Sequence, residues 1–490
     1  MKLRDLIEEL EYEVISGDVD REITELVNDN RKITKDCVFV CIEGANFDGH
    51  TAVYDAYDEG AAAVIVMKDV ALSDEGDTTV IRVSDTREAL ALTSAAYFGY
   101  PSRTVKVIGI TGTKGKTTTT YLVKSILENA GYKVGLIGTI ETIIGDEHIP
   151  SKNTTPESYV LQQTFRRMAD EGIDICVMEA SSQGFLMKRT CGTDFEIGIF
   201  TNLEPDHIGP NEHDSFENYL ECKSMLFKQC KVGILNGDDE HVGEILKGHT
   251  CQVETYGMKE GADFKASDIE LYENKGMLGI SFDISGKINT RVSIDMPGRF
   301  SLYNALTAVA VCSHFNISEE NIKTALKAAK VKGRIEMVPV SDDFTLMIDY
   351  AHNAMALESL LTTLKEYETG RLVCLFGCGG NRAKSRRFEM GEVSGRLADL
   401  TIITSDNPRF EKPLDIIEDI VTGISKTGGE YVKIPDRKEA IRYAIENGKK
   451  GDIIVLAGKG HEDYQEIEGK KYPMDERVLI AEVLEELKNI

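Results

Sequence analysis

The sequence lacks tryptophan, has only 11 prolines in 490 residues and contains no long apolar run. A membrane-spanning helix needs about 18 or more consecutive apolar residues, so none is expected. The first residues, MKLRDLIEELEYEV, include acidic side chains and no apolar stretch of signal-peptide length. Repeats, low-complexity tracts and long linkers are also absent, which argues against a repeat protein. We therefore expect a cytoplasmic globular protein.

The sequence also has no excess of positive charge and no closely spaced cysteine pairs of the CxxC type. The 56 basic and 82 acidic residues give a formal net charge of -26. This balance argues against a nucleic-acid or anionic-membrane partner, so a polyanionic ligand must meet a local basic pocket. None of the ten cysteines forms a CxxC pair, and most lie in apolar, strand-like runs. Reduced core cysteines are expected.

The chain is too long for one hydrophobic core. At about 150 residues per domain, its length predicts about three domains. Gly99 and Pro101 mark a first boundary. Beyond it, β-branched runs such as KVGLIG and IDICVM alternate with helical patterns, which predicts parallel sheets buried on both faces. We expect an α/β protein with an N-terminal domain over 1–102, a central domain with a parallel or mixed sheet over 103–333, and a Rossmann-like C-terminal domain over 334–490.

The turn in VIGITGTKGKTTTTYLV follows a strong strand and opens a helix. Backbone N–H groups at such a helix N-terminus favour phosphate. In this pattern Lys116 reaches the β- and γ-phosphates, and Thr117 offers a hydroxyl to Mg²⁺. The strict spacing would place glycine where Ile110 stands, one residue after Gly109. The predicted phosphate contacts are Gly112, Thr113, Lys114, Gly115, Lys116, Thr117 and Thr118.

Polar residues follow two further strands of the central domain. Glu179 ends the run IDICVME, and Asp206 and His207 follow EIGIF. Ligands of open parallel sheets bind at the carboxyl ends of strands, so these side chains are candidates to face the phosphate loop. Glu179 and His207, with Thr117, are therefore predicted Mg²⁺ ligands. A phosphate loop alone does not separate an ATPase, a GTPase, a transporter subunit and a ligase.

Three loops of the last domain, GCGGNRAKSRR, SDNPRF and GKGHED, each follow a predicted strand. Loops at the strand ends of one parallel sheet can meet in one crevice. Their mixture of acids, amide and arginine suits an amino acid that carries both an amine and carboxylates, since arginine holds a carboxylate bidentately. The residues brought together are Arg387, Asp406, Asn407, Arg409 and Glu462.

The whole series of motifs resembles the Mur ligase family. In chain order the motifs are TGTKGKTTT, NTTP, MEASS, TNLEPDH, ECKSMLF, GRFSLYNAL, KGRIEMV, DYAHNA, GCGGNR, SDNPR and AGKGHEDYQ. They cover nearly the whole chain. The resemblance implies an ATP-dependent amide ligase of peptidoglycan synthesis, acting on UDP-N-acetylmuramoyl-L-alanyl-D-glutamate through an acyl phosphate, with Mg²⁺.

The SDNPR motif resembles the branch of the family that adds meso-diaminopimelate. Diaminopimelate differs from lysine by one carboxylate, and a buried arginine left unpaired by lysine disfavours lysine strongly. Arg387 and Arg409 therefore favour diaminopimelate. The alternatives are a lysine-adding ligase, a folylpolyglutamate-type ligase, against which the N-terminal domain argues, and a non-catalytic, nucleotide-switched homologue. A monomer is expected.

The resemblance also implies roles for residues that the sequence alone does not single out. Lys223 would be carbamylated and would join the metal ligands, although composition alone favours a surface lysine on an amphipathic helix. The implied catalytic residues are Lys116, Lys223, His207 and Glu179. The implied further nucleotide contacts are Asn304, Arg334 and Asp349. The implied substrate contacts are Asn30, Ala45, Asn46 and Phe47 for the UDP end, Asn153, Thr154, Thr155, Ser181 and Arg189 for the muramoyl peptide, and Arg387, Asp406, Asn407, Pro408, Arg409, Gly458 and Glu462 for the amino acid.

Five positions and one segment depart from the family pattern. The positions are Asn30 for serine, Gln183 for histidine, Met187 for a polar residue, Ala354 for proline and Ala383 for an acid, and the segment is IGPNEHDSFENY after His207. These departures concern the sugar nucleotide and the amino acid, and they leave the predicted ATP contacts intact.

Overall fold

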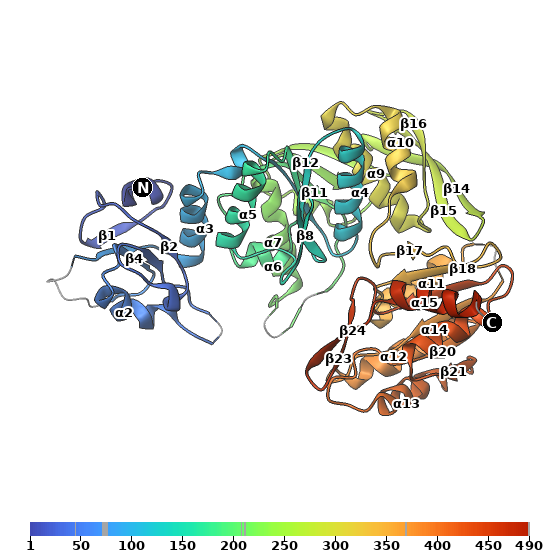
Figure 1. Cartoon of the computed structure of the whole chain (residues 1–490). Coiled ribbons are helices and arrows are strands. Elements are labelled where there is room, and N and C mark those ends of the chain that lie inside the picture. The colour runs from blue at the N-terminus through green and yellow to red at the C-terminus, as the bar shows by residue number, and fades with distance from the viewer. Residues whose placement is uncertain (45, 71–76, 207, 210–211, 368–369, 489–490) are drawn as a thin grey trace. The chain divides into compact units, whose positions relative to one another are not determined.

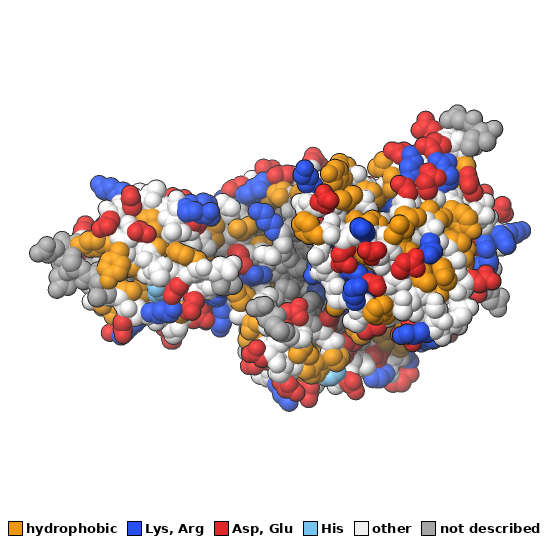
Figure 2. Space-filling view, turned by 90° about the horizontal axis from the view of Figure 1, so that it is seen from below, with side chains coloured by type: hydrophobic (Ala, Val, Ile, Leu, Met, Phe, Trp, Pro, Cys, Tyr) orange, Lys and Arg blue, Asp and Glu red, His pale blue; other side chains and the backbone are white. Residues whose placement is uncertain are grey.

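The computed structural model describes residues 1–44, 46–70, 77–206, 208–209, 212–367 and 370–488. The chain forms two compact units, Met1–Ala262 and Asp263–Ile490, and both combine helices with sheets (Figure 1). The predicted α/β class is thus confirmed. Acidic and basic side chains are interspersed over the face seen in Figure 2. Within the described ranges, no helix has the length and apolar character needed to cross a membrane.

The first sheet lies in the N-terminal part of the unit Met1–Ala262. Its strand order is β1-β5-β4-β3-β2, parallel except for the edge strand β1. The strands are β1 (Glu13–Ser16), β2 (Leu26–Val27), β3 (Val38–Val40), β4 (Ala63–Val66) and β5 (Thr79–Arg82), and the helices are α1 (Leu3–Leu6), α2 (Val53–Asp58) and α3 (Thr86–Tyr97). Asp85 caps α3 by accepting from two backbone N–H groups.

The second sheet of this unit carries the phosphate loop. Its strands follow the order β13-β12-β11-β6-β10-β7-β8-β9, and those from β13 to β7 are parallel. The strands are β6 (Lys106–Thr111), β7 (Val134–Ile137), β8 (Glu141–Ile144), β9 (Glu147–Pro150), β10 (Ile175–Glu179), β11 (Phe195–Phe200), β12 (Cys230–Asn236) and β13 (Gln252–Gly257). The helices are α4 (Lys116–Asn129), α5 (Ser158–Asp170), α6 (Ser182–Leu186), α7 (Phe216–Ser224) and α8 (Val242–Ile245).

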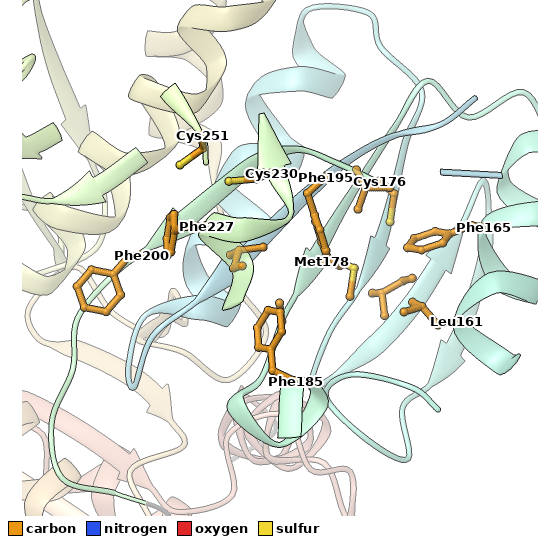
Figure 3. Close-up of a cluster of buried hydrophobic side chains, with 14 of the residues drawn as sticks. Leu161, Phe165, Cys176, Met178, Phe185, Phe195, Phe200, Phe227, Cys230 and Cys251 are labelled. Carbon is orange, nitrogen blue, oxygen red and sulfur yellow. The ribbon is translucent and has the colours of Figure 1, made fainter. Parts of the chain in front are cut away.

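The core of this sheet combines aliphatic, aromatic and sulfur-containing side chains, some of which are shown in Figure 3. Phe165 of α5 is fully buried, as are Cys176 and Met178 of β10. All ten cysteines are free, and all but the half-buried Cys191 are buried, as expected for reduced core cysteines.

The unit Asp263–Ile490 contains an antiparallel set, β16-β15-β14, and a sheet of order β17-β18-β22-β19-β20-β21 that is parallel except for β17. The strands are β14 (Phe264–Asn274), β15 (Met277–Gly286), β16 (Thr290–Ile294), β17 (Glu336–Met337), β18 (Thr345–Asp349), β19 (Leu372–Phe376), β20 (Leu400–Ile403), β21 (Tyr431–Lys433), β22 (Ile453–Ala457) and the hairpin β23 (Tyr464–Ile467) with β24 (Lys470–Pro473). The helices are α9 (Arg299–Cys312), α10 (Glu319–Ala328), α11 (Ala354–Leu364), α12 (Lys384–Leu397), α13 (Pro413–Ile424), α14 (Arg437–Glu446) and α15 (Glu476–Lys488).

Removing the Phe165 ring tests how much the core in Figure 3 stabilises the unit that carries the phosphate loop. We expect Phe165→Ala to lower the free energy of unfolding by about 3–5 kcal/mol, because the lost contacts leave a cavity. The measurement is urea unfolding followed by circular dichroism. Val160→Ala on the same helix is the control, since Val160 is 47% exposed. Equal urea midpoints of unfolding for the two variants would contradict the packing described.

Candidate active site

The turn between β6 and α4 is shaped by two glycines in the left-handed region. Gly112 has φ +144° and Gly115 has φ +87°. A Cβ on Gly112 would lie 1.9 Å from the Thr201 hydroxyl oxygen, so only glycine fits there. Gly115 caps α4, whose first N–H groups have no partner within the helix. The predicted phosphate cradle therefore has the required backbone form.

The segment after β11 braces this turn from one side. Asn202 accepts from the Thr113 N–H through its carbonyl at 2.9 Å and from the Lys114 N–H through its side chain at 2.9 Å. The Thr201 hydroxyl donates to the Lys114 carbonyl at 2.7 Å. The Lys114 ammonium pairs with Glu204 at 2.6 Å. The loop is thus held in shape by protein contacts before any ligand arrives.

Two lysines meet on one backbone carbonyl of the loop. Lys116 Nζ donates to the Gly112 carbonyl at 2.9 Å, and Lys223 Nζ donates to the same oxygen at 2.8 Å. Lys116 also donates to the Thr113 carbonyl at 3.0 Å. An anionic ligand in the loop would meet positive charge at this point.

Thr117 and Glu179 form the oxygen-rich part of the site. The Thr117 hydroxyl donates to Glu179 Oε1 at 3.0 Å, and Glu179 is 1% exposed. Thr139 fixes both carboxylate oxygens, through its N–H at 2.8 Å and its hydroxyl at 3.0 Å. A hydroxyl and a carboxylate side by side suit Mg²⁺, which takes few protein ligands beside phosphate and water oxygens. The described residues contain no cluster of three His, Cys, Asp or Glu side chains, and His207 lies outside them.

Lys223 lies on α7 and is 1% exposed, so the surface-lysine interpretation is wrong. Its ammonium stands 4.3 Å from the centre of the Tyr219 ring. Burial, and secondarily the positive charge of Lys116, lower the pKa of Lys223 well below its ordinary value. A neutral amine can attack carbon dioxide, whereas an ammonium cannot. The environment therefore fits the carbamylation that the motif implies.

The residues predicted to hold the muramoyl peptide gather beside the end of β10. The Thr155 hydroxyl donates to the Glu179 carbonyl at 2.9 Å and accepts from the Ser181 N–H at 2.9 Å. Arg189 donates to the Thr155 carbonyl at 3.1 Å. The Thr154 and Thr139 hydroxyls are 3.0 Å apart, and Asn153 is exposed. The structure thus brings this group to the same strand end as Glu179.

The predicted UDP contacts lie on loops of the first sheet. Asn30 opens a short 3-10 turn, Asn30–Lys32, capped by Asp29. Asn46 is exposed and Phe47 is 49% exposed. Ala45 lies outside the described residues. Their contact with a nucleotide stays a prediction.

Among the further nucleotide contacts, Arg334 and Asp349 lie near the end of β18. Asp349 accepts from the Ile335 and Ala351 N–H groups, both at 2.8 Å. Burial raises the pKa of the Asp349 carboxyl, and Arg334 opposes that rise. The Arg334 guanidinium lies 4.7 Å from the centre of the Tyr350 ring. Asn304 is buried on α9, and the nucleotide role of all three stays a prediction.

The three strand-end loops of the last sheet converge as predicted. The Asn407 amide donates to Glu462 at 3.0 Å, joining the loops after β20 and β22. A Cβ on Gly458, which has φ +106°, would lie 3.3 Å from an Asp406 oxygen. Pro408 precedes Arg409, whose guanidinium donates to the Gly380 carbonyl at 2.7 Å in the third loop.

The Arg387 guanidinium has other partners than the substrate carboxylate that the sequence predicted. It is 1% exposed and forms a two-point pair with Glu411, at 2.9 and 2.7 Å, and a bond with Asp419 at 2.8 Å. Arg387 lowers the pKa of the Glu411 carboxyl to about 2. Because its terminal nitrogens are bound to carboxylates of the chain itself, Arg387 braces the loop here and does not present a free fork to a substrate.

Sequence reasoning missed five residues of the site: Thr139, Tyr219, Lys459, Glu411 and Glu466. Lys459 had a usable signal, since it stands between two glycines in a strand-end loop. The others lie in stretches without a motif.

Comparison with known proteins assigns this chain to a family. Three family models match: "Mur ligase family, catalytic domain" over 22–98, "Mur ligase middle domain" over 110–312 and "Mur ligase, glutamate ligase domain" over 333–460. The chain belongs to the Mur ligase family, which confirms the resemblance seen in the sequence.

Full-length relatives are similar to this chain. UDP-N-acetylmuramoyl-L-alanyl-D-glutamate–2,6-diaminopimelate ligase 1 of Clostridium acetobutylicum is 44% identical over 491 residues, covering 99% of this chain and 100% of its own. The corresponding ligase of Clostridium botulinum is 42% identical over 492 residues, with the same coverage.

Solved structures of the family have the same fold. A structure of a UDP-N-acetylmuramoyl-L-alanyl-D-glutamate–2,6-diaminopimelate ligase has a TM-score of 0.74 at 27% identity, covering 100% of this chain and 99% of its own. The MurF ligase of Thermotoga maritima in complex with ADP has a TM-score of 0.59 at 18% identity, covering 95% and 98%. The second likeness concerns the fold alone.

Substituting Gly112 tests the phosphate cradle. We expect Gly112→Ala to lose binding of a fluorescent nucleoside triphosphate, because the added Cβ would collide with Thr201 and the backbone angle is left-handed. Gly243→Ala is the control, since a Cβ there meets nothing within 4 Å. Fluorescence titration measures both. Unchanged affinity in Gly112→Ala would contradict the assignment of the loop.

Proposed function

We propose that the chain is an ATP-dependent ligase that joins meso-2,6-diaminopimelate to UDP-N-acetylmuramoyl-L-alanyl-D-glutamate in peptidoglycan synthesis. The observation that carries the proposal is the 44% identity, over the full length of both chains, with a relative named for this activity. The resemblance of the sequence motifs to the family implies the same reaction. The phosphate loop and the converging loops of the last sheet supply the two kinds of site that the reaction needs.

The reaction proceeds in two steps. A carboxylate oxygen of the D-glutamyl residue attacks the γ-phosphorus of ATP, which gives an acyl phosphate and ADP. The amine of diaminopimelate then attacks the acyl carbon and loses a proton, and inorganic phosphate leaves as the amide forms. Phosphoryl transfer depends on positioning and charge neutralisation. The braced loop orients the phosphates, and Lys116 balances their charge.

The metal site would comprise Thr117, Glu179, His207 and carbamylated Lys223. Bound Mg²⁺ would neutralise charge on the phosphate oxygens. The carbamate forms when the Lys223 nitrogen attacks carbon dioxide and loses a proton. This replaces a buried amine by an anionic oxygen donor. The bonds from Thr139 to both oxygens of the Glu179 carboxylate support this assignment, because they fix the orientation of the carboxylate.

The amino-acid site would use Asp406, Asn407, Pro408, Arg409, Gly458 and Glu462. Glu462 and Asp406 would face the amine, and Arg409 would face the distal carboxylate that lysine lacks. Arg387 would hold the loop through its pairs with Glu411 and Asp419. The lysine-adding ligase is the alternative that differs in this site alone.

Other contacts and properties complete the proposal. Asn304, Arg334 and Asp349 would contact ATP, Asn30, Ala45, Asn46 and Phe47 the UDP end, and Asn153, Thr154, Thr155, Ser181 and Arg189 the muramoyl peptide. The domain boundaries would lie near 102 and 333, which agrees with the extents of the three family matches. A monomer in the cytoplasm, where ATP and the UDP-linked precursor occur, fits the reaction.

A substrate-selectivity assay tests the proposal. Purified protein receives ATP, Mg²⁺, the nucleotide dipeptide and either diaminopimelate or lysine, and ADP release and product mass are measured. We expect kcat/KM for diaminopimelate to exceed that for lysine by about 10³–10⁴-fold, because lysine lacks the distal carboxylate that Arg409 would meet. Lys116→Ala is the inactive control. A preference for lysine would establish the lysine-adding alternative, and ADP release with neither amino acid would favour a nucleotide switch.

Carbamylation of Lys223 has its own test. We expect ¹³C-labelled bicarbonate to give a carbamate resonance in the wild type that Lys223→Ala lacks. Ligase activity of Lys223→Ala should fall by about 10²–10³-fold, as for loss of one electrostatic stabiliser, and acetate should restore part of it. Lys231→Ala is the control, since that lysine is exposed and paired with Glu196. Full activity in Lys223→Ala would rule out a role of the carbamate in the reaction, and the absence of a carbamate resonance in the wild type would rule out its formation.

A further inference from the structure

Lys459 is an ammonium group held entirely inside the protein. It follows Gly458 after β22 and is 0% exposed. Its Nζ donates to Asn407 Oδ1 at 3.0 Å, to Glu462 Oε2 at 2.8 Å and to the Tyr464 carbonyl at 2.5 Å. An ammonium has three N–H donors, so this group is fully satisfied. Lys459 therefore has no donor left for a substrate.

Two of its three partners are residues assigned to the amino-acid site. The Asn407 side chain also accepts from the Glu466 N–H at 2.8 Å and donates to Glu462 Oε2 at 3.0 Å. These bonds determine which way the amide faces. Glu462 Oε2 thus receives two donors within the chain, one from Lys459 and one from Asn407, and Glu462 Oε1 would meet an incoming amine.

We propose that Lys459 is a positioning residue for amino-acid selection. It acts as an internal ammonium that aligns Asn407 and Glu462 before the substrate binds. Without it, Glu462 would lose its only ion-pair partner among the described residues, and the Asn407 amide would be free to turn. The inference rests on the proposed function, because it concerns the site that would hold diaminopimelate.

The competing role is structural, since Lys459 also bonds to the Tyr464 carbonyl at the start of the hairpin β23–β24. Lys471 provides a matched control. Both ammonium groups face the Tyr464 ring, at 5.1 Å for Lys459 and 3.8 Å for Lys471, but Lys471 is exposed and bonds to neither Asn407 nor Glu462 in any contact described here.

Kinetics of Lys459→Met, which keeps the length of the side chain, separates the two roles. We expect KM for diaminopimelate to rise at least about 10-fold, while KM for ATP and for the nucleotide dipeptide stays within about 2-fold, because a buried polar pair is lost at one subsite only. Lys471→Met should leave all three constants unchanged. Turnover by the wild type in the same series tests the proposed function. The ratio of the variant's KM for diaminopimelate to that of the wild type tests the role of Lys459.

A double-mutant cycle with Glu462→Gln provides the second measurement. If Lys459 acts through Glu462, the two substitutions together should raise KM for diaminopimelate by much less than the product of their separate effects. Multiplicative effects, or an equal rise of KM for all three substrates with a lowered Tm, would overturn the proposal. An unchanged KM for diaminopimelate in a folded Lys459→Met protein would overturn it as well.

Discussion

The Gly112 carbonyl, which accepts from both Lys116 and Lys223, is the point on which the central site depends. Two lysines this close repel each other, and one of them is fully buried. One carbonyl lies between them, and burial lowers the pKa of Lys223 well below its ordinary value. The same environment that makes Lys223 a poor cation makes it a good nucleophile toward carbon dioxide.

The sheets of the two units place chemistry at the same structural position, the carboxyl ends of parallel strands. In the first unit, β6, β10 and β11 lead into the phosphate loop, Glu179 and the bracing segment at Asn202. In the second, β19, β20 and β22 lead into the loops that carry Gly380, Asn407 and Glu462, and Arg387 follows on α12. In both, bonds between loops are joined by bonds from neighbouring helices, such as Lys223 of α7 to the Gly112 carbonyl and Arg387 of α12 to Glu411, so the loops are braced by the chain itself.

The sequence predicted the buried strands well, because β-branched runs such as ICVME and LVCLF are read directly as parallel strands. It did not reveal β1, β14 or the hairpin β23–β24. Those strands are mostly exposed and polar, and their pairing depends on neighbours far away in the chain.

The residues of the candidate site also fall into two groups, those that the sequence predicted and those that only the fold reveals. Residues within motifs, such as Lys116, Glu179 and Asn407, were found. Thr139 and Glu466 were not found, because each acts through contacts with residues distant in the chain that only the fold creates. Arg387 shows the opposite error. Its motif suggested a free guanidinium, but two acids on other elements occupy it.

Selection of the amino acid depends on more than the DNPR loop itself. Arg409 has φ +52°, a conformation that costs a non-glycine residue about 1–2 kcal/mol. The hairpin offsets this cost, since the Arg409 N–H donates to the Glu466 carbonyl at 2.9 Å and the Glu468 N–H donates to the Arg409 carbonyl at 2.7 Å. The Glu466 carboxylate also holds Arg409 Nε at 3.0 Å. The direction of the guanidinium is therefore set by a hairpin with no recognisable motif. The same four letters on a different hairpin would present their arginine differently.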